Sequence, residues 1–300
     1  MKDRYKVIMN PKYGYRHLAP LPTAEKLNDF YREQYYDLVA AGGRAPGEQR
    51  LMQGGGESNS ELVWLSKTTW SDIQDTLEQH LSHKKERWLL DVGSGPGCFG
   101  KYMQEAGWHV VGIEPSGKAA EIARSSGITV FNSVEECFGR VERRFDAIVL
   151  LQVLEHILDP AGLIQSLRRL MLEQSILVIQ VPNDFSAIQE CACGKLNLEP
   201  WWITAPDHIN YFNFESLVGF LRKLDFQVVE MFGDFPMEMF LFFGDIYVGN
   251  PDIGSQVHKK RMAFELALPS ELRRNLYRCF AGNGLGRRCL VFAQPLGDEQ

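Results

Sequence analysis

The sequence predicts an α/β fold in which a mostly parallel sheet carries helices on both faces. Short apolar runs typical of buried strands alternate with helical patterns from residue 59 onward. A glycine-rich loop directly follows the first of these runs, and acidic or amide residues follow several others. Ligands of such sheets bind at the carboxyl ends of the strands, so we expect the functional site at that edge.

The composition is that of an ordinary globular chain. Its 300 residues are 45% apolar, enough for one large domain or for one domain with additions. The net charge of -6 argues against general nucleic-acid binding. We expect a cytoplasmic protein, because no apolar run approaches the roughly 18 residues of a membrane span and the N-terminus lacks a signal peptide's apolar segment. The six cysteines form no Cys-x-x-Cys pair and are expected to be free thiols.

An N-terminal segment, residues 1–58, is expected ahead of a main domain over residues 59–300. Its first part predicts a short amphipathic helix that packs an aromatic face on the main domain. The residues at helical spacing are Leu27, Phe30, Tyr31 and Tyr35. Residues 40–58 are rich in glycine and polar side chains, which indicates either an inert linker or a lid that orders when ligands bind.

A helical stripe of apolar residues runs from Asn59 to Leu81 and predicts the helix before the first strand. That strand is expected where the apolar run from Trp88 ends in the acid Asp91, just before alternate glycines from position 93 to position 97. Because glycine has no Cβ, this loop can adopt positive φ and lie flat against a ligand. A dinucleotide-binding fingerprint would need glycine at position 98, where Cys98 stands.

Strand and helix patterns continue to alternate after the glycine loop. The expected strands are residues 109–113, 128–131, 145–151 and 175–181, with helices near 98–106 and 116–126. The first of these strands ends at Glu114, an acid that can bind both ribose hydroxyls of an adenosine ligand. Asp91, Gln152 and Asn183 are expected at the same edge of the sheet.

The C-terminal third holds a long loop, a helix and two more strands. The loop from Pro182 to about Phe214 has a length that is more often functional than not. The expected elements after it are a helix near 214–224 and strands over 226–230 and 288–293. Residues 233–287 separate these strands, and this insertion, with its aromatic and methionine run, indicates a substrate cover or a homodimer contact.

Four stretches together resemble the class I S-adenosylmethionine-dependent methyltransferases: the glycine loop, Glu114, and residues 145–151 and 153–160. The resemblance implies a Rossmann-like fold with seven strands, the last of them antiparallel, and S-adenosyl-L-methionine as cofactor. It gives the methionine part of the cofactor to the glycine loop, its amino group to Asp91 and its ribose to Glu114. The implied cofactor-binding residues, including those near adenine, are Asp91, Gly93, Gly95, Gly97, Glu114, Asn132, Leu151 and Gln152.

The segment from Asp207 to Phe212 resembles the Asp/Glu-His-Ile/Val-x-Tyr/Phe-Phe stretch of sugar and small-molecule methyltransferases. The resemblance implies His208 as the general base toward the acceptor and Asp207 as the residue that orients it. The alternative is a histidine that fixes the loop by hydrogen bonds. Ala205 replaces a tyrosine of some sugar C-methyltransferases, which leaves the choice between O- and C-methylation open.

Glu155 and His156 match part of the Mg²⁺ site of a related group of RNA-end methyltransferases, which use two glutamates, this histidine and a later one. Gln152 stands where the first glutamate would be, and an amide is a poor substitute for a carboxylate on a hard cation. We therefore expect no metal and assign Glu155 and His156 to stabilising the loop after the fourth strand.

These features predict an enzyme that methylates a small polar acceptor, with a nucleotide-linked sugar or other carbohydrate precursor favoured. The alternatives are O-methylation of a phenolic or quinone precursor and a catalytically silent binding module of the same fold. Residues 257–290 carry eight basic residues against two acidic ones, and Arg287 and Arg288 in this segment could bind a phosphorylated acceptor. The other interpretation of the segment is a solvated helix face.

Overall fold

The computed structural model describes residues 5–30, 37, 39, 55–206 and 208–297. The chain divides into two compact units. The C-terminal unit comprises Met1–Leu21, Leu150–Gln165 and Leu177–Gln300, and the glycine-loop unit comprises Pro22–Val149 and Ser166–Ile176. Tyr31, Tyr35 and most of the expected glycine-rich loop, residues 40–54, lie outside the described residues. The expected boundary at residue 58 stays a prediction.

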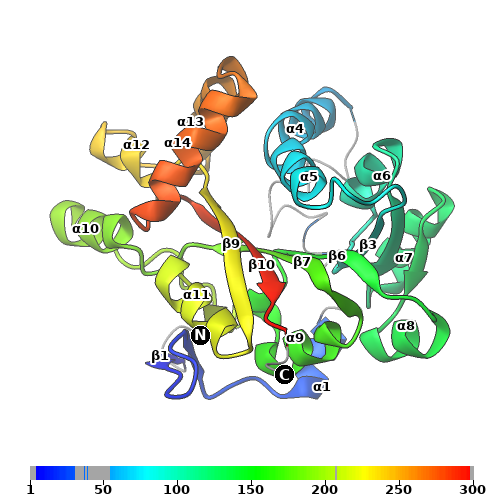
Figure 1. The fold of residues 1–300 in the computed structure, drawn as a ribbon. Helices are drawn as coiled ribbons and strands as arrows, with labels where there is room; N and C mark the ends of the chain where they lie inside the picture. The colour runs from blue at the N-terminus through cyan, green and yellow to red at the C-terminus, as the bar shows by residue number, and fades with distance from the viewer. Residues whose placement is uncertain (1–4, 31–36, 38, 40–54, 207, 298–300) are drawn as a thin grey trace. The chain divides into compact units, whose positions relative to one another are not determined.

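Seven strands form the main sheet in the order β5-β4-β3-β6-β7-β10-β9. They are β3 (Trp88–Val92), β4 (His109–Ile113), β5 (Thr129–Phe131), β6 (Phe145–Leu151), β7 (Met171–Pro182), β9 (Phe226–Gly233) and β10 (Arg288–Pro295). The first three pair in parallel, whereas β10 is antiparallel to both of its neighbours, β7 and β9. The two closing strands lie side by side in Figure 1. The predicted Rossmann-like sheet with an antiparallel last strand is confirmed.

Helices alternate with these strands along the chain, as the sequence predicts. They are α1 (Ala24–Asp29), α4 (Gly55–Lys67), α5 (Thr69–His80), α6 (Cys98–Glu105), α7 (Gly117–Ser125), α8 (Val134–Arg140) and α9 (Pro160–Arg168). In the glycine-loop unit, Leu89 and Leu90 of β3 are fully buried, and so are Ala120 and Ala123 of α7. This core holds the carboxyl ends of β3 and β4 in fixed register.

The single helix expected from Asn59 to Leu81 is two helices, α4 and α5, which are separated at Thr68. The Thr68 hydroxyl donates a hydrogen bond to the carbonyl oxygen of Trp64, 2.6 Å away. Such a bond from threonine to the preceding turn bends helices. The expected loop over residues 40–58 is also too long, because α4 begins at Gly55.

A small second sheet in the C-terminal unit is absent from the sequence predictions. Its strands are β1 (Lys6–Met9), β2 (Arg16–Ala19) and β8 (Asn210–Tyr211), in that order and antiparallel. The ring of Tyr15, between β1 and β2, lies 4.8 Å from that of Phe212 and 5.7 Å from that of Phe220. Phe220 belongs to α11 (Phe214–Arg222), so the N-terminal hairpin is packed against the segment that follows His208.

Three helices fill the insertion between β9 and β10: α12 (Glu238–Phe242), α13 (Pro251–Ala267) and α14 (Ser270–Gly282). An apolar cluster of Phe235, Met237, Phe240 and Val257 packs inside it. The insertion therefore has a core of its own, and its role as a cover or dimer contact stays a prediction. Among the described helices, none is long and apolar enough to cross a membrane.

Candidate active site

The glycine loop after β3 adopts the conformation that its sequence predicts. Gly93, Gly95 and Gly97 have φ values of 72°, 53° and 85°, a region that other residues rarely adopt. At Gly97 there is also no room for a side chain, because a Cβ would lie 2.7 Å from Cδ1 of Ile128. Backbone conformation thus requires glycine at all three positions, and space requires it at Gly97 as well.

Glu114, directly after β4, holds this loop. Its Oε2 accepts a hydrogen bond from the backbone amide of Gly95, and its Oε1 accepts one from the backbone amide of Ser116. The donor-acceptor distance is 2.8 Å in each. The residue is only 5% exposed. Each carboxylate oxygen has a second lone pair, so both oxygens can still accept a hydroxyl donor from a ligand.

Asp91, at the carboxyl end of β3, is the second acid beside the loop. Burial and, to a smaller extent, the charge of Glu114 together raise the pKa of its carboxyl to about 7. Burial likewise raises the pKa of Glu114, although its two amide hydrogen bonds oppose the shift. Two buried carboxylates close together repel one another. A ligand that brings positive charge and hydrogen-bond donors would stabilise both of them. The ammonium group and ribose hydroxyls of S-adenosylmethionine meet that requirement, so the residues fit this cofactor.

The other three predicted cofactor residues lie in different surroundings. Asn132, after β5, has an exposed side chain whose Oδ1 accepts a hydrogen bond from Nη2 of Arg124 over 3.0 Å. Leu151 and Gln152 belong to the C-terminal unit, at the end of β6. Gln152 has a positive φ of 59°. Its backbone N–H donates a hydrogen bond to the backbone carbonyl oxygen of Gln180. Their contact with adenine stays a prediction.

His208 lies in the loop before β8, and Asp207 lies outside the described residues. The ring of His156 meets that of His208 edge-on at a centroid distance of 4.8 Å. Glu155 completes this cluster, because ligand atoms of all three residues lie within 4.8 Å of one another. The sequence analysis assigned Glu155 and His156 only a stabilising role, whereas in the structure both lie beside the predicted base.

Asn210 fixes the position of this cluster. Its side-chain nitrogen donates to the carbonyl oxygens of Leu154 and Ile157, over 2.8 and 2.6 Å. The 3₁₀ turn between them, Leu154–His156, carries two members of the cluster. The amide of Ile209 donates to the carbonyl oxygen of Glu155 over 2.8 Å. The sequence analysis did not single out Asn210, although its place inside a buried apolar segment is a signal for such a role.

One carboxylate and two imidazoles form a donor set that suits a borderline divalent cation such as Zn²⁺ or Fe²⁺ better than Mg²⁺. Glu155 is 1% exposed, and the two histidines are half-buried. A cation held by these three residues would keep open coordination positions. The expected absence of a metal stays a prediction.

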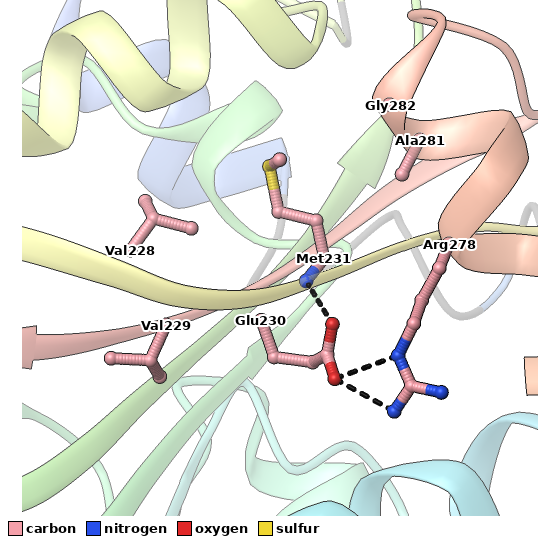
Figure 2. Close-up of a pocket in the computed structure, with 7 residues that line it drawn as sticks. All are labelled: Val228, Val229, Glu230, Met231, Arg278, Ala281 and Gly282. Carbon is pink, nitrogen blue, oxygen red and sulfur yellow. Dashed lines mark hydrogen bonds and ion pairs between the residues drawn. The ribbon is translucent and has the colours of Figure 1, made fainter. Parts of the chain in front are cut away.

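Figure 2 shows a hollow on the edge strand β9 and helix α14, and no predicted site residue of the described chain is among the residues that line it. It is lined by Val228, Val229, Glu230, Met231, Arg278, Ala281 and Gly282. Arg278 donates from Nε and Nη2 to Oε2 of Glu230, over 2.9 and 2.8 Å. The only charged groups of this lining are thus engaged with one another.

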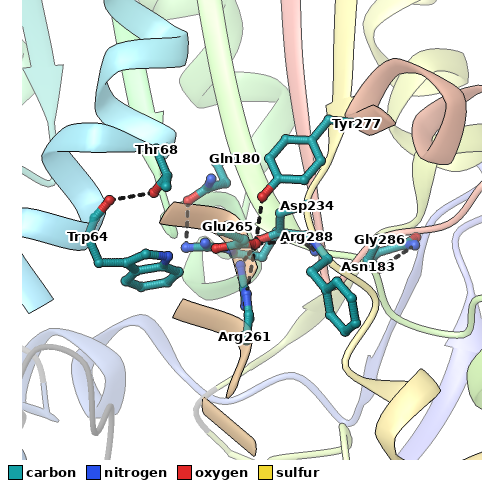
Figure 3. Close-up of polar contacts among 11 residues, drawn as sticks. Trp64, Thr68, Gln180, Asn183, Asp234, Arg261, Glu265, Tyr277, Gly286 and Arg288 are labelled. Atoms are coloured by element: carbon teal, nitrogen blue, oxygen red, sulfur yellow. Dashed lines mark hydrogen bonds and ion pairs between the residues drawn. The ribbon is translucent and has the colours of Figure 1, made fainter. Parts of the chain in front are cut away.

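Most arginines of the basic segment for which contacts are described are held by acids rather than turned to solvent. Asp234 bonds to both Arg261, at 2.7 Å, and Arg288, at 2.6 Å, as Figure 3 shows. Oε1 of Glu265 accepts from Arg261 over 3.1 Å and from the hydroxyl of Tyr277 over 2.6 Å. The structure therefore does not support a phosphate-binding role for Arg288.

A family described as a methyltransferase domain matches residues 67–231, more than half of the sequence. The chain belongs to this methyltransferase family. The matched region includes the glycine loop, Asp91 and Glu114. Recognition of a class I S-adenosylmethionine-dependent methyltransferase from these residues is confirmed by the family and by the fold.

Curated relatives of this methyltransferase include ubiquinone biosynthesis O-methyltransferases from two bacteria. The protein of Alkalilimnicola ehrlichii is 35% identical over 104 residues, which are 32% of this chain and 42% of that one. The protein of Aromatoleum aromaticum is 28% identical over 156 residues, 48% of this chain and 66% of that one. The chain thus spans about half the length of the curated relatives it matches.

Solved structures resemble the methyltransferase over almost its whole length. The 1,6-didemethyltoxoflavin-N1-methyltransferase of Burkholderia thailandensis, with its acceptor and S-adenosylhomocysteine bound, has a TM-score of 0.52 at 15% identity and covers 97% of this chain and 98% of its own. The plantazolicin methyltransferase BpumL, in complex with S-adenosylhomocysteine, has a TM-score of 0.50 at 13% identity, with coverages of 90% and 94%. At these identities the likeness concerns the fold.

Proposed function

We propose that this methyltransferase transfers the methyl group of S-adenosylmethionine to a hydroxyl of a phenolic or quinone-precursor acceptor. The observation that carries the cofactor assignment is the glycine loop bound at Gly95 to Glu114, beside the buried Asp91. The acceptor class is supported by the curated relatives, which are named for ubiquinone biosynthesis. These relatives favour the O-methylation alternative over the nucleotide-sugar acceptor that the sequence analysis preferred.

The bound cofactor supplies a methyl sulfonium, which is already an activated electrophile. The protein therefore has to hold donor and acceptor in line and to remove one proton from the acceptor. In this proposal the glycine loop and Asp91 bind the methionine part, and Glu114 accepts hydrogen bonds from the ribose hydroxyls. These contacts orient the cofactor, whereas proton removal from the acceptor needs a separate base.

His208 is the proposed general base for the acceptor hydroxyl. A neutral imidazole can accept this proton near pH 7. The hydroxyl of Tyr211 donates to the carbonyl oxygen of His208 over 2.8 Å, and the amide of His208 donates to Thr204 over 3.1 Å, so the backbone of the base is held on both sides. Asp207 keeps its proposed role of orienting the base.

A divalent cation is a second candidate for the cluster of Glu155, His156 and His208, because their ligand atoms converge within 4.8 Å. A cation there would lower the pKa of an acceptor hydroxyl. The hydroxyl could then lose its proton without a free imidazole as base. Sensitivity to chelators separates this candidate from the metal-free base.

The function is tested with purified protein and methyl-labelled S-adenosylmethionine. Catechol, 3,4-dihydroxybenzoate, a nucleotide sugar and a free hexose are offered as acceptors, each with and without EDTA. We expect label in the methyl ethers of the two phenols. Label in the nucleotide sugar alone would restore the carbohydrate acceptor, and binding of S-adenosylhomocysteine without transfer to any acceptor class would favour a silent binding module.

A further inference from the structure

Three ionisable side chains of the C-terminal unit have no role in the site described so far. Asp184 follows β7, Glu238 begins α12, and Arg287 directly precedes β10. Asp184 is 2% exposed and Glu238 is 1% exposed. The charges of Arg287 and Glu238 both act on the pKa of Asp184, so the three groups lie within electrostatic reach of one another. We call them the Asp184 cluster.

Four polar atoms of this cluster are buried and have no hydrogen bond of normal geometry within the described part of the chain, although the Gln189 side chain lies near enough to Glu238 to lower its pKa. They are Oδ2 of Asp184, both carboxylate oxygens of Glu238 and Nη1 of Arg287. Nearly all buried polar groups of native proteins are hydrogen-bonded, and each exception asks for an explanation. Asp234, another buried acid of the same unit, differs from Asp184 because it forms ion pairs with two arginines. The Asp184 cluster thus has the features of a binding site.

The charges of the cluster limit what it can bind. Burial raises the pKa of Asp184 to about 7, the charge of Arg287 opposes this shift and that of Glu238 adds to it. Burial also raises the pKa of Glu238 against the effect of Arg287. Two acids therefore face one guanidinium. A phosphate would meet two carboxyl groups, whereas an uncharged hydroxyl can donate to one acid and accept from the arginine.

Aromatic rings surround the same segment. The ring of Phe185, next to Asp184, lies edge-on to those of Trp202 and Tyr211, with centroid distances of 5.4 and 5.8 Å. Burial raises the pKa of the Tyr247 hydroxyl, and the nearby charge of Glu238 contributes. Such rings pack edge-on or offset against a flat aromatic ligand.

The Asp184 cluster is also tied to the segment of the proposed base. The amide of Asp184 donates to the carbonyl oxygen of Phe212 over 2.7 Å, and the hydroxyl of Tyr211 donates to that of His208. His208 and Phe212, whose carbonyl oxygen accepts the hydrogen bond from Asp184, are thus only four residues apart in the chain. One acceptor ring can then be expected to engage both groups, with different substituents.

We propose that Asp184, Glu238 and Arg287 recognise the acceptor by binding an uncharged hydroxyl on its aromatic ring, other than the hydroxyl that is methylated. This inference rests on the proposed function, since it gives that site's substrate class as a dihydroxylated ring. The same proposal predicts that the cluster does not bind a phosphate group.

The test is calorimetric titration of catechol, phenol and phenyl phosphate into protein saturated with S-adenosylhomocysteine. Asp184→Asn and Glu238→Gln preserve shape and remove the charge, and Glu190→Gln on the exposed face of α10 (Ala187–Leu196) is the matched control. We expect each cluster variant to weaken catechol binding about tenfold or more, and phenol binding less than about threefold. Affinity for S-adenosylhomocysteine should match that of the control.

Unchanged catechol affinity in both folded variants would overturn the inference. Ordered water would then be the hydrogen-bond partner of the buried polar atoms. Tighter binding of phenyl phosphate than of catechol to the unmodified protein would also overturn it, without need of any variant. Failure to bind S-adenosylhomocysteine would instead refute the proposed function, and catechol binding to the protein alone would then still decide the inference.

Discussion

Glu114 and Gly95 are joined by a hydrogen bond of 2.8 Å between the carboxylate and the loop amide. The carboxylate proposed to bind the ribose therefore also fixes the loop proposed to bind the methionine part. Loss of Glu114 should act on both halves of the cofactor at once, because it removes the ligand contact and frees the loop amide together.

Glu114→Ala should weaken binding of S-adenosylhomocysteine by about 2 to 4 kcal/mol, which is roughly 30- to 1000-fold, because two charge-assisted hydrogen bonds are lost. Isothermal titration calorimetry measures this. Glu121→Ala, an exposed acid on the neighbouring helix α7, should leave the affinity unchanged. Equal affinities of both variants would remove Glu114 from the cofactor site.

His208→Ala should lower turnover about 10²- to 10⁴-fold and leave binding of S-adenosylhomocysteine near wild type, since the base acts only on the acceptor proton. His156→Ala separates the two candidate roles of the cluster. If the imidazole of His208 acts without a metal, EDTA should have no effect and His156→Ala should retain most activity. Turnover of His208→Ala within threefold of wild type would refute the role of His208.

Asp184 should make stability depend on pH. Its carboxyl has a pKa of about 7 in the folded protein against an ordinary value of 3.8, because it is buried. The folded state thus keeps a proton that the unfolded chain releases, so this group's contribution is full below about pH 4 and is lost as the pH rises through 7. Asp184→Asn should gain about 1 to 3 kcal/mol relative to wild type between pH 5 and pH 8.

Urea unfolding at several pH values measures this difference. Comparison with the wild-type protein is essential, because burial raises the pKa of Asp91 to about 7 as well, with a further contribution from the charge of Glu114. Subtraction removes the part due to Asp91, and Glu190→Gln controls for loss of an acid from the surface. A difference that stays constant from pH 5 to pH 8 would contradict the buried state of Asp184.

Arg261→Met should destabilise the protein by about 3 to 5 kcal/mol, because it leaves buried acids without their partner. Arg261 bonds to Asp234 at 2.7 Å and to Glu265 at 3.1 Å, and its side chain is 6% exposed. Arg278→Met is the control, since the side chain of Arg278 in its ion pair with Glu230 is 40% exposed. Its loss should cost less than about 1 kcal/mol in the same unfolding experiment.

The main sheet was predictable because its strands are apolar runs that stop at glycine, an acid or an amide. β4 and β6 begin and end at the residues expected. The sheet of β1, β2 and β8 was missed, since its strands have at most four residues and β1 lacks a buried side chain to give alternation. Helix α4 begins in a run of glycines, which local propensity assigns to a loop.

The glycine loop and Glu114 could be found because the site follows directly from two strand ends. The Asp184 cluster could not, since Asp184, Glu238 and Arg287 come from three separate segments and none lies in a recognisable motif. The ion pairs of the basic segment could not be predicted for a related reason. Net charge counts Arg261 and Arg288 as basic, but in the fold both form ion pairs with Asp234, which lies outside that segment.

The small sheet also has a consequence for synthesis on the ribosome. β2 leaves the ribosome long before its partner β8 and before Asn210, whose hydrogen bonds hold the 3₁₀ turn. Domains fold from the N-terminal side as they appear. We therefore expect the glycine loop and Glu114, the residues proposed to bind the methyl donor, to be synthesised before the contacts that position His208, the proposed base.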